Sequence, residues 1–306
     1  KEYANSKGIS IVGDIPIFVA SDSADVWANQ KLFQLDSEGK STAVAGVPPD
    51  YFSATGQLWG NPLYNWDAMK KTGYKWWIDR IRAMLSVVDY VRIDHFRGFE
   101  AYWSIPYGDE TAVNGKWIDG PNIALFDAIK KALGELPIIA EDLGVITDGV
   151  RKLRDDAQFP GMKVLQFAFD PGEAGKDGMV NAFLPHMYPQ TSVVYTGTHD
   201  NDTMQGWLDT ASDAAVKIAA DYAFGEAKTE KEARALSDSG ELCKALIRSA
   251  IASTADMAVI PMQDILGLGV DARMNIPNTT GTNWSWRIAD GALTKESAEW
   301  LAFISD

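Results

Sequence analysis

Three short segments each place a carboxylate directly after an apolar run of the kind that forms a buried strand. These carboxylates belong to Asp94, Glu141 and Asp200. Strands that are buried on both faces have continuous apolar sequences, and in a barrel of alternating strands and helices the residues at their carboxyl ends line one active-site face. The sequence therefore predicts that three acids converge on one pocket.

Such a set of acids is suited to retaining cleavage of a glycosidic bond, which needs a carboxylate nucleophile and a protonated carboxylic acid about 5 to 5.5 Å apart. Asp94 is the predicted nucleophile, because Arg92 lies two residues earlier on the same strand face and its guanidinium would stabilise an ionised carboxylate. Glu141 follows an apolar run whose burial would raise its pKa, as a general acid requires. Asp200, with His199 beside it, would bind sugar hydroxyls and stabilise the transition state.

Each acid also has a structural interpretation, because acids at strand ends commonly cap the next helix or pair with basic side chains. Two of the three histidines, His95 and His199, adjoin the candidate acids, which favours an active site. The run from His199 to Asp202 could suggest a metal site, but it lacks paired His or Cys ligand spacing. We expect neither a metal nor a cofactor.

The composition excludes some classes of partner and location. A net charge of −14 and a pI near 4.7 argue against a nucleic-acid partner, whose phosphates need a basic surface. The single cysteine, Cys243, allows no intrachain disulfide and favours a reducing compartment. An apolar run of about 18 residues and a charged-then-apolar leader are both missing from the sequence. We therefore expect a cytoplasmic protein with no membrane partner.

Eleven tryptophans are many for 306 residues, and several lie in polar, glycine-containing surroundings. Flat indole faces suit contact with sugar rings, although filling a large core is an equally good interpretation for any one of them.

Strand-like and helix-like segments alternate along the chain, which is typical of a parallel α/β fold. The predicted strands are residues 9–16, 87–94, 136–141, 162–169, 192–200 and 257–263. The predicted helices are residues 77–85, 121–133, 148–156, 211–222, 240–253 and 294–304. Gly134 would end the second of these helices.

A closed barrel of this class has eight strands, whereas six are visible here. The opening residues 1–8 resemble the end of a helix. We therefore expect residues 1–306 to be the C-terminal portion of a catalytic (β/α)₈ TIM barrel that lacks the first two strands. Repeats, low-complexity tracts and linkers are not apparent.

The connection from residue 18 to about residue 66 is far longer than the usual 2 to 6 residues or so. We expect residues 19–67 to form inserted rim loops or a subdomain. Its second part, with Tyr51 and Trp59 between prolines and glycines, is typical of an active-site loop that covers an extended ligand. An ordinary surface insertion is the alternative.

The motifs around the candidate acids resemble those of the α-amylase clan, and their fuller forms closely resemble amylomaltase, the 4-α-glucanotransferase or disproportionating family. These fuller forms are Arg92-Ile93-Asp94-His95-Phe96-Arg97-Gly98-Phe99 and Gly197-Thr198-His199-Asp200-Asn201-Asp202-Thr203. The resemblance extends from about Gly8 to Arg287 through five further segments, residues 13–20, 48–64, 112–117, 261–264 and 272–275.

The resemblance implies a (β/α)₈ barrel with inserted subdomains and retaining transglycosylation. An α-1,4-glucan segment would be transferred, through a glucosyl ester on an aspartate, to the 4-hydroxyl of glucose or a maltooligosaccharide. Matched by position, the nucleophile is Asp94, the general acid/base Glu141 and the transition-state stabiliser Asp200. The implied sugar-contacting residues are Asp14, Arg92 and His199, and the loop from Tyr51 to Trp59 would close over the glucan.

Two other functions stay open on the sequence. A hydrolase of the same clan would differ only in passing the covalent intermediate to water. A non-catalytic glucan-binding module would use the tryptophan-rich surface, and its acids would be structural.

Overall fold

The computed structural model describes residues 1–49, 53–171, 181–277 and 279–305. Contacts between residues divide the chain into two compact units, Lys1–Gly161 and Met162–Asp306. Each unit contains strands of parallel sheet and a hydrophobic core of its own.

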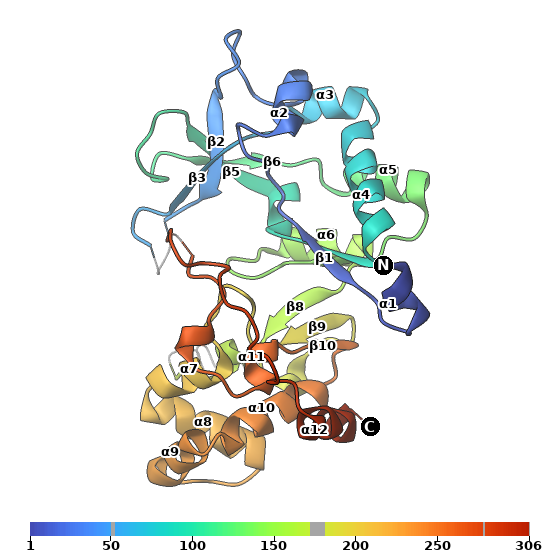
Figure 1. Cartoon of the computed structure of the whole chain (residues 1–306). Helices are drawn as coiled ribbons and strands as arrows, with labels where there is room; N and C mark the ends of the chain where they lie inside the picture. The colour runs from blue at the N-terminus through green and yellow to red at the C-terminus, as the bar shows by residue number, and fades with distance from the viewer. Residues whose placement is uncertain (50–52, 172–180, 278, 306) are drawn as a thin grey trace. The chain divides into compact units, whose positions relative to one another are not determined.

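The first unit contains parallel strands in the order β1-β4-β7, and the first of them, β1, is labelled in Figure 1. These strands are β1 (Val12–Ile15), β4 (Tyr90–Ile93) and β7 (Ile138–Ala140). Asp14 is opposite Arg92, and Ile93 is opposite Ala140. The register therefore brings the residues that follow β4 and β7 to the same edge of the sheet. Gly161, the first residue of β8 (Gly161–Val164), pairs with Ala140.

An antiparallel sheet with the order β3-β2-β5-β6 also lies in the first unit. Its strands are β2 (Ala43–Val47), β3 (Gln57–Pro62), β5 (Ala101–Pro106) and β6 (Lys116–Asp119). β2 and β3 fall within the segment predicted to be rim loops. The strands pack tightly there, because a Cβ on Gly46 would lie 2.1 Å from the carbonyl oxygen of Gln57.

The helices of the first unit confirm the three that the sequence predicted there. They are α1 (Glu2–Ser6), α2 (Ala24–Ala28), η1 (Gln30–Leu32), α3 (Trp66–Lys71), α4 (Lys75–Val87), η2 (Phe96–Phe99), α5 (Ile123–Leu133) and α6 (Asp148–Ala157). The Thr147 hydroxyl caps α6 by accepting a hydrogen bond from the Val150 amide at 3.3 Å. Gly134 ends α5 with a φ of 84°, a conformation that favours glycine.

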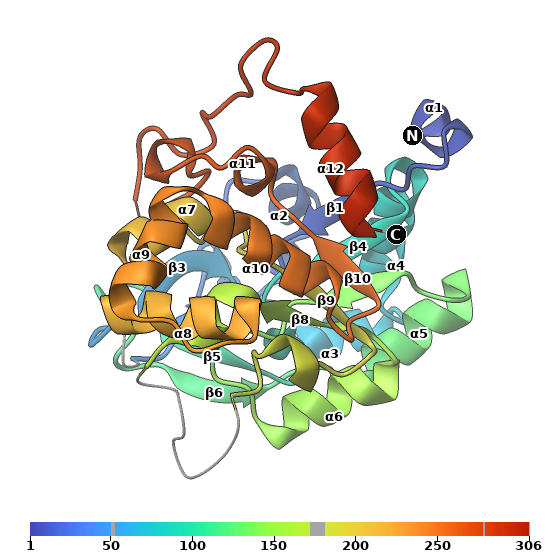
Figure 2. The same ribbon diagram turned by 90° about the horizontal axis from the view of Figure 1, so that it is seen from below.

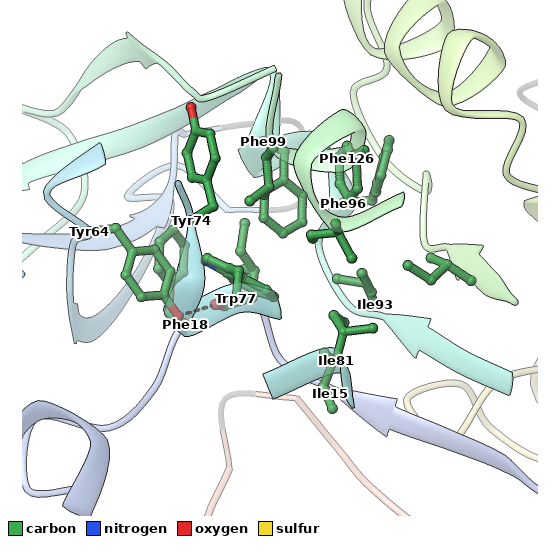
Figure 3. Packing of buried hydrophobic residues seen from close by; sticks show 14 of the residues in the cluster. Ile15, Phe18, Tyr64, Tyr74, Trp77, Ile81, Ile93, Phe96, Phe99 and Phe126 are labelled. Carbon is green, nitrogen blue, oxygen red and sulfur yellow. Dashed lines mark hydrogen bonds between the residues drawn. The ribbon is translucent and has the colours of Figure 1, made fainter. Parts of the chain in front are cut away.

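Aromatic side chains form much of the first unit's core (Figure 3). The ring centroids of Trp77 and Phe99 lie 5.2 Å apart, and those of Phe99 and Phe126 lie 5.1 Å apart. Phe96 and Phe99 belong to η2, which begins two residues after Asp94. Burial of these rings therefore fixes the chain directly after the candidate nucleophile.

Ile81 tests the contribution of this core to stability, because its side chain is fully buried in the middle of α4. We expect Ile81→Ala to lower the free energy of unfolding by about 2 to 5 kcal/mol, through lost apolar burial and the cavity that remains. Val87→Ala, at an exposed position of the same helix, should change it by less than about 0.5 kcal/mol. Urea unfolding of both variants would measure the difference, and equal losses would contradict the packing described.

The second unit contains strands in the order β8-β9-β10. β9 is Ser192–Tyr195, β10 is Met257–Val259, and the two pair in parallel. A parallel strand lies within or at the start of each of the six predicted segments, but each strand is shorter than its prediction. Two of the predicted segments were wrong at their ends, because residues 165–169 form the 3-10 helix η3 and residues 262–263 begin the helix α11.

The second unit contains more helix than strand, and three of its helices, α8, α9 and α10, lie side by side in Figure 2. The helices are η3 (Leu165–Phe169), η5 (Pro185–Met187), α7 (Met204–Thr210), α8 (Asp213–Phe224), α9 (Glu230–Asp238), α10 (Glu241–Ile251), α11 (Met262–Ile265), η6 (Val270–Ala272) and α12 (Lys295–Ser305). The predictions for α8, α10 and α12 are confirmed. α9 was not predicted, although its capping box, with Thr229 and Glu232, is a recognisable start signal.

Across the described ranges, none of the helices is both long enough and apolar enough to pass through a lipid bilayer.

Candidate active site

A guanidinium joins two carboxylates at the carboxyl ends of β1 and β4. Arg92 Nη1 donates to Asp14 Oδ2 at 2.6 Å, and Arg92 Nη2 donates to Asp94 Oδ1 at 2.8 Å. The register explains the first contact, because Arg92 lies opposite Asp14, and the two-residue spacing explains the second. The Arg92 side chain is 9% exposed, whereas Asp14 and Asp94 are 42% and 47% exposed. The cluster therefore has a buried cation and two carboxylates that a ligand can reach.

Glu141 follows β7 and is held by two backbone amides. Its Oε1 accepts from the Leu143 amide and its Oε2 from the His95 amide, both at 2.8 Å. Burial, together with the negative charge of Asp94, raises the pKa of Glu141 to about 7, against the opposing effect of the two amides and Arg92. A carboxyl group with this pKa can both give and take a proton near neutral pH.

His95 connects these groups through an unusual backbone conformation. Its φ of 52° lies in the left-handed region, which is uncommon for a residue with a side chain, and its amide donates to Glu141. The imidazole packs edge-on against Trp59, with 4.7 Å between ring centroids. Burial lowers the pKa of His95 to about 4, so the ring is neutral at physiological pH. Its Nε2 is buried and has no hydrogen-bond partner in the described part of the chain.

In the second unit, Asp200 lies in the loop between β9 and α7, and a distant segment holds it. Its Oδ1 accepts from Asn275 Nδ2 at 2.6 Å, and its carbonyl oxygen accepts from Arg273 Nη2 at 2.6 Å. His199 Nε2 lies 3.6 Å from Asp200 Oδ1. The backbone N–H of Asn275 donates to the carbonyl oxygen of His199 at 3.1 Å. The backbone and the side chain of Asp200 are therefore both fixed.

A pocket of about 160 Å³ lies beside this loop. The His199 ring and the indole of Trp284 form part of its wall, with 5.0 Å between ring centroids. Gln263, Arg273 and Asp202 contribute polar groups. An aromatic face beside hydrogen-bonding groups is the combination that a sugar ring requires.

The predicted site residues divide between the two units. In the first unit, Asp14, Arg92 and Asp94 are in direct contact, while Glu141 and Trp59 are both contacted by His95. In the second unit, His199 and Asp200 are adjacent. Tyr51 lies outside the described residues. The convergence of all three acids on one pocket stays a prediction.

Three residues that contribute to these sites were given no role from the sequence. They are His95, Arg273 and Asn275. His95 was noted only as a neighbour of Asp94, and the other two only as part of a family-like segment. Position next to a candidate acid was a usable signal for His95. For the other two, sequence distance from Asp200 concealed the contact.

Comparisons of the sequence and of the structure with known proteins return relatives from one enzyme family. A model of the 4-alpha-glucanotransferase family matches residues 1–294. The 4-alpha-glucanotransferase of Streptococcus pneumoniae is 51% identical over 301 residues, which cover 98% of this chain and 56% of that protein. The 4-alpha-glucanotransferase of Thermus thermophilus is 52% identical over 308 residues, which cover 100% of this chain and 59% of that protein.

A solved structure, that of the amylomaltase of Streptococcus agalactiae in complex with acarbose, superimposes with a TM-score of 0.90 at 41% identity. The match covers 100% of this chain and 58% of that one. It confirms the predicted fold class, part of a (β/α)₈ barrel. The chain thus spans between 56% and 59% of the length of these three relatives.

Proposed function

The chain belongs to the 4-alpha-glucanotransferase family, and from this we propose that it carries the reacting groups of such an enzyme. The complete protein would transfer a segment of an α-1,4-glucan to the 4-hydroxyl of glucose or of a maltooligosaccharide. The observation that carries the proposal is the cluster of Arg92, Asp14 and Asp94, with Glu141 beside it at a pKa of about 7.

In the first step, Asp94 attacks the anomeric carbon of the donor sugar and forms a glucosyl ester. Glu141 gives its proton to the glycosidic oxygen, so that the departing glucan leaves as an alcohol. Contact with Arg92 supports this role for Asp94, because the guanidinium holds one carboxylate oxygen at 2.8 Å while leaving the side chain 47% exposed to a ligand. The raised pKa of Glu141 keeps a large fraction of this carboxyl protonated near neutral pH.

In the second step, the 4-hydroxyl of the acceptor attacks the ester carbon and Asp94 leaves. The ionised Glu141 takes the proton of that hydroxyl, so the same group acts first as acid and then as base. Two inversions at one carbon retain the α configuration. A pKa near 7 suits both roles of this carboxyl group.

The remaining predicted residues would bind the sugar. We propose that Asp200 and His199 approach the same donor ring. Asp14 and Trp59 are also proposed to contact the sugar. The fixed position of Asp200 supports a role in which its carboxylate must face a developing positive charge. Tyr51 is proposed to contact the glucan from the same loop as Trp59.

Transfer requires that an acceptor sugar reacts faster than water. The aromatic face of Trp59, which packs against His95, would hold an acceptor next to the ester, and this proximity favours sugar over water. We further propose that the chain binds acarbose, as the related amylomaltase does. A cytoplasmic location and an inserted subdomain at residues 19–67 belong to the same proposal.

Incubation of the complete protein with maltotriose, followed by chromatography, tests the reaction. Glucose together with a ladder of longer maltooligosaccharides is the expected result. Isotope-labelled glucose added to the mixture should enter the ladder, which identifies glucose as an acceptor. Glucose and maltose without longer products would instead indicate a hydrolase, and binding without products would indicate a glucan-binding module. The 306-residue chain assayed in parallel would show how much of the activity it supports alone.

A further inference from the structure

A buried carboxylate outside the proposed catalytic set joins both ends of the loop that carries Asp200. Asp264, in α11, is 2% exposed. Its Oδ2 accepts from the Thr196 hydroxyl at 2.5 Å, and its Oδ1 accepts from the Met204 amide at 2.7 Å. Thr196 is the first residue after β9, and Met204 is the first residue of α7. One side chain therefore closes the loop at both of its ends.

The helix α11 is itself held in place by α10. It also contacts the segment at residues 272–273, which binds the backbone of Asp200. The Cys243 thiol of α10 donates to the Asp264 carbonyl at 3.7 Å. Gln263 Nε2 donates to the Ala272 carbonyl at 3.2 Å. The next residue, Arg273, binds the Asp200 carbonyl at 2.6 Å. Adjacent side chains of α11 thus hold the loop and the segment that contacts Asp200.

The two oxygens of Asp264 accept hydrogen bonds from two groups at once, one from the Thr196 hydroxyl and the other from the Met204 amide. The amide can only donate, whereas the hydroxyl can also accept. An asparagine in the same place can therefore accept from the amide and donate to the hydroxyl, so only a side chain without both polar atoms breaks both contacts. Burial, with a smaller effect from the negative charge of Asp202, raises the pKa of Asp264 to about 6, which leaves it mostly ionised at neutral pH.

We propose that Asp264 is a positioning residue for catalysis, which acts through Thr196 and Met204 to hold Asp200 in its place toward the donor sugar. The inference rests on the proposed function of Asp200. Asp264 is 2% exposed and does not line the pocket beside the loop, so its effect on catalysis depends on the placement of the loop. Displacement of a catalytic group by about 1 Å can lower a rate about a hundredfold.

A pair of substitutions at Thr196 tests the inference while the buried carboxylate stays in place. Thr196→Val has nearly the same shape but removes the hydroxyl, and Thr196→Ser keeps the hydroxyl. In the complete protein we expect Thr196→Val to lower kcat for maltotriose disproportionation by about ten- to a hundredfold, with a much smaller change in KM. Thr196→Ser should recover most of kcat. Hydrogen exchange of a peptide covering residues 196–204 should be faster in the valine variant alone.

Asp264→Ala removes both contacts to the loop and should lower kcat at least as far as Thr196→Val, and Val216→Ala provides the control for general destabilisation. Val216 is fully buried in α8, so its truncation lowers the thermal midpoint without removing a bond to the loop, and kcat should stay within about twofold of wild type.

An active wild-type protein with unchanged kcat and unchanged exchange in Thr196→Val would overturn the positioning role. Equal losses of kcat in the valine and serine variants would do the same. An inactive wild-type protein would instead reject the proposed function, and the exchange measurement alone would then decide whether Asp264 holds the loop.

Discussion

Asp94→Asn should abolish glucan transfer in the complete protein, lowering kcat for maltotriose disproportionation on the order of 10⁴-fold or more. Loss of a nucleophile removes the covalent route altogether, and a neutral amide cannot replace it. Because asparagine has the same shape and retains one oxygen that can accept from Arg92, the fold should survive. Arg92 also keeps its 2.6 Å contact with Asp14.

Product chromatography would measure the loss, and circular dichroism during heating would show whether the variant is folded. Asp127→Asn is the matched control, because it removes the same charge from an exposed position of α5 in the same unit. This control should leave kcat within about twofold of wild type. Turnover of Asp94→Asn above about one per cent of wild type, in a folded protein, would reject Asp94 as the nucleophile.

The strands β7 and β9 were predictable because they are buried on both faces, so that their sequences are nearly uninterrupted apolar runs. Ile138–Ala140, for example, is fully buried. The antiparallel sheet was not predictable in the same way. Its strand β3 has the sequence Gln-Leu-Trp-Gly-Asn-Pro, and glycine and proline in so short a segment are typical of a loop. Tertiary pairing with β2 outweighs this local preference.

Two adjacent acids follow β7, and only the structure shows how differently they are used. Asp142 turns inward to form an ion pair with Arg154 Nη1 at 2.6 Å, which is the structural role that any such acid could have had. Glu141 instead accepts from the amides of His95 and Leu143. The left-handed turn at His95 that presents one of these amides is a backbone property, and no periodicity in the sequence encodes it.

Contacts between distant segments were the other part that sequence reasoning could not supply. Asn275 reaches Asp200 across 75 positions, and Asp264 reaches Thr196 across 68. Local patterns predict the strands and helices that such residues follow, but they do not predict the parallel pairing of β9 with β10 that brings the loops after these strands together. The positions of the acids and the local contact of Arg92 with Asp94 were therefore accessible from sequence, whereas the distant residues that hold Asp200 in place were not.

Glu141→Gln should lower kcat for maltotriose by about 10²- to 10⁴-fold, the usual contribution of general acid–base catalysis. The wild-type rate of the first step should fall as the pH rises through about 7, because the pKa of Glu141 is raised to that value and only its protonated form can assist the departing glucan. Glutamine neither gives nor takes a proton, so this dependence should be absent from the variant.

α-Maltosyl fluoride separates the acid from the nucleophile, because fluoride leaves without protonation. With this donor, Glu141→Gln should release a burst of fluoride equal to the protein concentration and then turn over slowly, since no base remains to activate the acceptor. The trapped maltosyl ester should add its mass to the protein, on the peptide that contains Asp94. Asp94→Asn should show neither burst nor mass increase. A Glu141→Gln variant as slow with the fluoride as with maltotriose would mean that this carboxyl group does not protonate the leaving oxygen.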